Sequence, residues 1–206
     1  MLQDGELQPD GNRRMVILEA WENLTSPGPT LSSHERISVI RATREAWAGG
    51  SDVPNRASIE DVGHWLAVDA GGFTADTVGT LETGGLDRFR YLEAVGVASR
   101  LAQVDFYARG LGASLLPVPD ELDLPATGGV AVGAQLHDAW VPAIGNLSAV
   151  SVLDALPSDG LAFRALLEPF YVPFSQFMNT DYRDELHRTQ IEYIAARTSY
   201  LNECFY

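Results

Sequence analysis

Residues 192–206 have the sequence EYIAARTSYLNECFY, and they decide how the rest of the chain is interpreted. Apolar and small side chains recur here at helical spacing, which predicts a final helix over Tyr182–Tyr206. We expect burial of Ile191, Ile194 and Leu201 to hold its body in place. The stretch also contains Cys204, the only cysteine of the 206 residues. The sequence therefore predicts a packed helix that leads into a single thiol.

Helix start signals recur along the chain. Ser32 and Glu35 form a capping-box pattern, and Ser58, Thr74 and Asp87 each precede an apolar periodic segment. The helix that begins at Asp87 is apolar on much of its circumference, so we expect it to be central. Convincing strand alternation is absent, and the predicted fold class is all-α.

The proposed organisation has four parts. We expect an N-terminal arm and short helix over 1–30, and a first helical half over 31–114. A Pro-rich connecting segment over 115–149 follows, with Trp140 as its anchor, and 150–206 forms a second helical half. Within the second half, short helices are predicted over Val150–Leu156 and Leu161–Phe170.

The two halves share an internal similarity. A shift of 99 residues aligns Leu92–Tyr107 with Ile191–Tyr206. Glu93 then lies over Glu192, and twelve residues later Asp105 lies over Cys204. A duplication would explain this, with the thiol lost from the first copy, and chance similarity between two amphipathic helices is the alternative.

Charge and composition exclude several classes of protein. The net charge is −14, from 28 acidic and 14 basic residues, so nucleic acid and anionic membranes are not expected partners. Apolar runs fall short of the roughly 20 residues that a membrane span needs, and the polar N-terminus is not a signal peptide. We therefore expect a cytoplasmic protein. The four histidines are scattered, and neither a metal nor another cofactor is predicted.

The chemistry of the closing stretch depends on Cys204 and Glu192. A thiol reacts as its thiolate, and a nearby carboxylate can relay protons. The two residues lie about 18 Å apart along a straight helix, from 1.5 Å per residue, so they meet only where the chain turns back. The alternatives are a structurally paired Glu192 and an inert, buried Cys204.

The pattern of Glu192 followed twelve residues later by Cys204, together with Ala195–Arg197 and Asn202–Tyr206, resembles the active-site helix of the alkylhydroperoxidase D-like, carboxymuconolactone decarboxylase superfamily. In that motif a Glu precedes Cys-x-x-Cys, and a His follows. The similarity covers about residues 31–206 and is to a peroxidase-related branch, through further segments that include His64, Gly85–Val97, Asp105–Gly112, Pro117–Pro119 and Ala139–Pro142.

The resemblance implies an all-helical, oligomeric protein that reduces peroxides with a thiol reductant. Cys204 matches the resolving cysteine and Glu192 the carboxylate of the proton relay, and Tyr206 is a further candidate beside them. The attacking cysteine and the following His have no counterpart in the 206 residues. We expect the next codon to be UGA, encoding selenocysteine, and this form to have little or no peroxidase turnover.

Two other functions are open at this point. One is a non-redox decarboxylase or lactone-processing enzyme of the same superfamily, with His64, Glu93 and Asp105 as candidate catalytic residues. For His64 the simpler interpretation is a hydrogen-bonded histidine beside Trp65. The other is a non-catalytic helical module that forms homo-oligomers.

Overall fold

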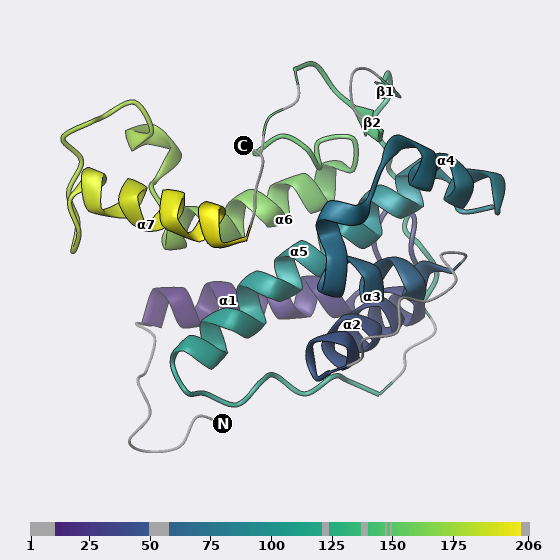
Figure 1. The fold of residues 1–206 in the computed structure, drawn as a ribbon, viewed down its shortest axis with the longest axis horizontal. Helices are drawn as coiled ribbons and strands as arrows, with labels where there is room; N and C mark the ends of the chain where they lie inside the picture. The colour runs from purple at the N-terminus through teal and green to yellow at the C-terminus, as the bar shows by residue number, and fades with distance from the viewer. Residues whose placement is uncertain are drawn as a thin grey trace. The chain divides into compact units, whose positions relative to one another are not determined.

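The computed structural model describes residues 11–49, 58–120, 124–136, 140–146, 148 and 150–202. This part of the chain is mostly helical, which confirms the predicted all-α class (Figure 1). Its α-helices are α1 (Gly11–Thr25), α2 (Ser33–Trp47), α3 (Ile59–Asp69), α4 (Ala75–Thr83), α5 (Arg88–Gly110), α6 (Pro157–Leu167) and α7 (Arg188–Leu201). Short 3-10 helices are η1 (Ala70–Gly72), η2 (Glu168–Phe170) and η3 (Phe174–Gln176).

Local capping chemistry sets the starts of the first helices. The Ser32 hydroxyl accepts from the Glu35 backbone N–H at 3.2 Å, and the Glu35 carboxylate accepts from the Ser32 N–H at 2.8 Å. Ser58 forms an equivalent box, while Thr74 and Asp87 cap α4 and α5 through their side chains. All four predicted helix starts are confirmed. Each relies on contacts between residues two or three positions apart, which a sequence displays directly.

The chain forms two compact units, Met1–Leu166 and Leu167–Tyr206. In the first unit α5 contacts α1, α2, α3 and α4, as expected of a central helix. Its buried face includes Leu92, Val97 and Leu101. The ring of Trp65, on α3, lies 4.4 Å from that of Phe73, which in turn packs on Tyr91 of α5. The core of this unit therefore surrounds α5.

The connecting segment differs from its prediction in three ways. It contains a small antiparallel pair, β1 (Gln135–Leu136) and β2 (Pro142–Ala143), with Gln135 opposite Ala143. Trp140 is 42% exposed, so it does not anchor the segment, whereas Ala143 is buried. Residues 150–156 form successive turns rather than a helix, because Leu156 N–H donates to Leu153 at 2.8 Å, three residues back. The following helix begins at Pro157, a residue suited to the first helical position.

The second unit contains η2, η3 and α7. Helix α7 begins at Arg188 rather than Tyr182, because the His187 side chain accepts from the Thr189 N–H and caps the helix. Ile194 and Leu201 are 52% and 64% exposed, so the prediction that their burial holds this helix is wrong. The physical reason is size, since so short a unit has too few residues to enclose a helix. None of the described helices has the length and apolarity that crossing a membrane requires.

Candidate functional site

The predicted site residues lie on three helices. His64 is on α3, Glu93 and Asp105 are on α5, and Glu192 is on α7 in the second unit. Cys204 and Tyr206 lie outside the residues that the structure describes.

Glu93 lies at the centre of a buried ion network in the first unit. Its side chain is 0% exposed, and its Oε1 accepts from Arg36 Nε at 2.7 Å. Its Oε2 accepts three further bonds, from Thr30 N–H at 2.6 Å, Thr30 Oγ1 at 2.7 Å and Leu31 N–H at 3.1 Å. Both carboxylate oxygens are thus occupied by donors of the protein itself.

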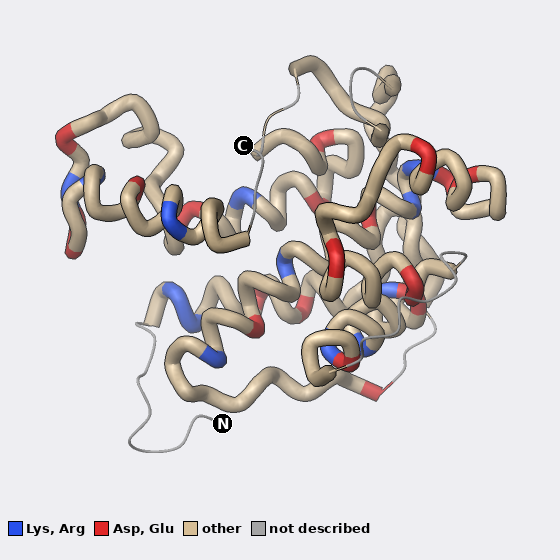
Figure 2. Tube along the Cα trace, viewed as in Figure 1, with Lys and Arg blue, Asp and Glu red and all other residues tan. Residues whose placement is uncertain are grey.

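Arg36 continues the network to a second carboxylate. Its Nη2 donates to Asp159 Oδ1 at 2.7 Å and Oδ2 at 2.5 Å, and its Nη1 donates to the Asn23 carbonyl at 2.9 Å. Arg100 joins from α5 through bonds of 2.6 Å to Asp159 Oδ1 and to Asn23 Oδ1. The network therefore ties α1, α2, α5 and α6 together, and Figure 2 shows charges distributed over these helices.

The pKa shifts of the two arginines indicate that the buried ion network has a structural role. Burial acts to lower the pKa of Arg36, but the charges of Asp159 and Glu93 outweigh it and raise that pKa. For Arg100 burial prevails and lowers the pKa, although Asp159 acts against it. Two arginines face two carboxylates, so the buried charges balance, and breaking the set by removing one member is costly. The arrangement fits a role in fixing helix positions better than one in chemistry.

Gly28 makes this close packing sterically feasible. A Cβ at this position would lie 2.0 Å from both Arg36 Nη2 and Glu93 Oε1. The backbone of residue 28 thus passes directly over the ion pair, where only glycine fits.

Asp105 belongs to a separate pair on the same helix. Its carboxylate receives two bonds of 2.7 Å from Arg44, one each from Nε and Nη2. The guanidinium of Arg44 also lies 4.7 Å from the centre of the Trp21 ring and donates to the Leu116 carbonyl at 2.9 Å. Asp105 is 0% exposed, so it too is held by a fixed cation.

The structure does not assemble His64, Glu93 and Asp105 into one site. Glu93 and Asp105 lie about 18 Å apart along α5 and bind different arginines. The His64 Nε2 atom is buried and has no hydrogen-bond partner among the described residues. The three side chains thus provide no common catalytic geometry for a decarboxylase or lactone-processing reaction.

Glu192 has a different environment from Glu93. The Tyr171 hydroxyl donates to its Oε1 at 2.8 Å, and Arg188 Nε donates to the same oxygen at 2.6 Å. Its Oε2 has no hydrogen-bond donor among the residues that the structure describes. The side chain is 45% exposed. Glu192 is therefore oriented through one oxygen on a half-exposed side chain, an arrangement suited to proton transfer.

Two neighbours hold this carboxylate. Arg188 lies one turn before Glu192 on α7, donates to the Phe177 carbonyl at 3.1 Å and stacks over the Phe177 ring. Burial is the main cause that raises the pKa of Tyr171, and its hydrogen bond to the Glu192 carboxylate adds to the effect. The phenol consequently stays protonated at neutral pH and acts as a donor to Glu192.

The roles of Arg36, Arg100 and Asp159 were not predicted from the sequence. Arg36 lies one turn before the buried Ile40, and Arg100 lies between the buried Val97 and Val104, so both occupy apolar faces. All fourteen basic residues are arginines, the cation best suited to buried bidentate pairs. These two signals in combination could have marked Arg36 and Arg100 as buried arginines, but not their partners. No group of three or more potential metal ligands occurs among the described residues.

The chain was compared with models of protein families, with curated proteins and with solved structures, and none of them matches it.

Proposed function

We propose that this protein acts in thiol-dependent peroxide reduction, with Cys204 as a redox thiol and Glu192 as the carboxylate that relays protons. The observation that supports this most is the accessible, oriented carboxylate of Glu192, with Oε1 bound by Tyr171 and Arg188. The resemblance of the closing stretch to the alkylhydroperoxidase D-like motif supports the same assignment. A reducing compartment such as the cytoplasm would keep Cys204 as a thiol.

The proposed reaction uses two redox groups. A thiolate or selenolate attacks one peroxide oxygen, the O–O bond breaks, and the leaving alkoxide takes a proton and departs as an alcohol. The resulting sulfenic or selenenic acid is attacked by the Cys204 thiol, which forms a disulfide or selenyl sulfide and releases water. A thiol reductant then restores both groups. Glu192 would supply and receive the protons of these steps.

The geometry of α7 sets one condition for this role. The helix ends at Leu201, with Asn202 as its C-cap, and it rises about 14 Å between Glu192 and its end. For Glu192 to serve Cys204 of its own chain, the segment after Leu201 must therefore turn back along the helix. A second copy of the chain could supply Cys204 instead.

The test adds a second thiol. Since Cys204 is the only cysteine, the 206-residue chain is expected to consume little peroxide in the presence of a dithiol reductant. A variant with one cysteine appended directly after Tyr206 completes Cys-x-x-Cys, and we expect it to gain turnover. In this variant Cys204→Ser should abolish turnover, and Glu192→Gln should reduce it by about a hundredfold, the lower end of general acid–base contributions.

Glu185→Gln is the matched control, because Glu185 is an exposed residue of the same unit. It should leave turnover unchanged. Turnover by the unmodified chain that disappears in Cys204→Ser would contradict the expected inactivity of that form. An appended cysteine that brings no turnover, or a Glu192→Gln variant as active as Glu185→Gln, would refute the proposed roles.

A second candidate function is a helical module that forms homo-oligomers. It is favoured by the exposed apolar and aromatic side chains of α7, which include Tyr193, Ile194, Tyr200 and Leu201. A surface of this kind commonly marks an interaction site. Light scattering tests this function: Ile194→Glu should convert an oligomer to a monomer, while a wild-type chain that is already monomeric would exclude it.

A further inference from the structure

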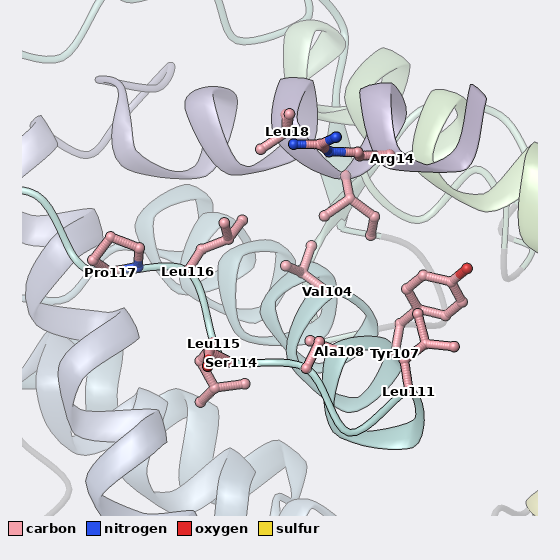
Figure 3. Close-up of a pocket in the computed structure, with 12 residues that line it drawn as sticks. Arg14, Leu18, Val104, Tyr107, Ala108, Leu111, Ser114, Leu115, Leu116 and Pro117 are labelled. Carbon is pink, nitrogen blue, oxygen red and sulfur yellow. The ribbon is translucent and has the colours of Figure 1, made fainter. Parts of the chain in front are cut away.

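The first unit contains a half-open apolar hollow with a volume of about 180 Å³, distant in sequence from Cys204 (Figure 3). One face of α1 and the C-terminal part of α5 form its walls. The extended segment after α5, residues 113–117, completes the lining. The apolar side chains among its lining include Ile17, Leu18, Val104, Leu111, Leu115 and Leu116.

The walls of the hollow are fixed by hydrogen bonds. Ala113 N–H donates to the Ala108 carbonyl at 2.9 Å, and Gly112 has a φ of +70°, which suits the glycine that turns the chain here. At the far end Arg44 Nη1 donates to the Leu116 carbonyl at 2.9 Å while it remains paired with Asp105. The extended segment is therefore held at both ends, and the hollow is formed before any ligand arrives.

One cation stands at the rim. The Arg14 side chain runs along α1 towards Leu18, above the hollow (Figure 3). Arg14 is exposed and has no ion pair with any residue that the structure describes. Polar groups at this site are otherwise few, namely the Tyr107 and Ser114 hydroxyls. An apolar cavity with a single cation at its rim is complementary to an apolar body that carries one negative charge.

We propose that this hollow binds a small monocarboxylate with a compact apolar body, of the size of benzoate. A cavity of about 150 Å³ is enough to hold a benzene ring, so the volume fits one ring or a short branched chain. The carboxylate would pair with Arg14 at the rim, where a guanidinium offers two parallel donors. Longer acyl chains exceed this volume.

The test is a titration of the full ¹⁵N-labelled chain with benzoate, followed by amide chemical shifts. We expect a dissociation constant on the order of 1 mM and shifts that centre on residues 14–18 and 104–117. Arg14→Gln should weaken binding about fivefold, while Arg13→Gln, the same change on the neighbouring residue, should not. Neutral benzyl alcohol should bind the wild type about fivefold more weakly than benzoate does.

Ala108→Phe fills the hollow and should abolish binding, and unchanged tryptophan fluorescence would show that this variant is folded. The proposal is overturned by shifts that lie elsewhere, by equal affinity for benzyl alcohol, or by no binding at all. If benzoate does not bind and Ala108→Phe instead changes the oligomeric state, a second copy of the chain is the occupant, and the proposal is equally wrong.

Discussion

Replacing Glu93 by glutamine tests the buried ion network. Glu93 accepts four hydrogen bonds, three at Oε2 and one at Oε1. A glutamine offers one carbonyl oxygen, so its NH₂ group must face either Arg36 Nε or the donors of Thr30 and Leu31. In either orientation the NH₂ group faces another hydrogen-bond donor, and Arg36 loses the negative charge of Glu93. Because loss of one partner from a buried ion pair costs about 3–5 kcal/mol, the free energy of unfolding should fall by that amount.

The assay is urea unfolding followed by tryptophan fluorescence. All four tryptophans lie in the first unit, so the signal reports the unit that contains Glu93. With a slope of about 2 kcal/mol per M, the midpoint should fall by about 2 M. The matched control is Glu192→Gln, at the aligned position of α7, where the side chain is 45% exposed. It should leave this transition unchanged, since it lies in the other unit. A Glu93→Gln midpoint within about 0.5 M of the wild type would refute the assigned role of the network.

Two further predictions concern the same unit. Gly28→Ala should lower the free energy of unfolding by about 3 kcal/mol or more in urea titrations, because its Cβ would lie 2.0 Å from Arg36 and Glu93. Gly79→Ala, in α4 with open space around the added carbon, should instead raise it by about 0.5–1 kcal/mol, and equal effects of the two changes would contradict the packing described. Burial raises the pKa of Tyr91 to about 12 from an ordinary 10. The contribution of its protonated phenol to the free energy of unfolding is therefore complete below pH 10 and is lost as the pH rises to 12. The unfolding free energy should fall over this range by up to about 2.7 kcal/mol, and Tyr91→Phe, but not Tyr200→Phe, should remove that part of the pH dependence.

The features that the sequence predicted correctly are local ones. Ser32, Ser58, Thr74 and Asp87 each satisfy backbone donors within three residues, so the helix starts could be located before any tertiary contact was known. The start of α7 was missed because its cap is His187, a side chain outside the usual capping set. The central place of α5 was also predictable, since its apolar residues cover much of its circumference.

Long-range pairings could not be predicted from the sequence. Arg36 and Asp159 are 123 positions apart, and no spacing rule connects them. The same holds for Arg44 and Asp105, which are 61 positions apart. Each charge viewed alone is compatible with a solvated helix face, and only the folded structure shows that Arg36, Asp105 and Asp159 are buried. Candidate carboxylates could therefore be found from the sequence, but their partners could not.

The two aligned glutamates show why the partners decide the chemistry. Glu93 and Glu192 occupy matching positions in similar helical stretches, yet Glu93 has donors on both oxygens and Glu192 on Oε1 alone among the described residues. A carboxylate that exchanges protons needs an oxygen that a substrate, a water molecule or a thiol can reach. Glu93 cannot provide one without breaking a bond to Arg36, Thr30 or Leu31, whereas Glu192 provides Oε2 without any rearrangement. If the two helices arose by duplication, the first copy now forms the core of its unit, while the second keeps a carboxylate oxygen without a donor among the described residues.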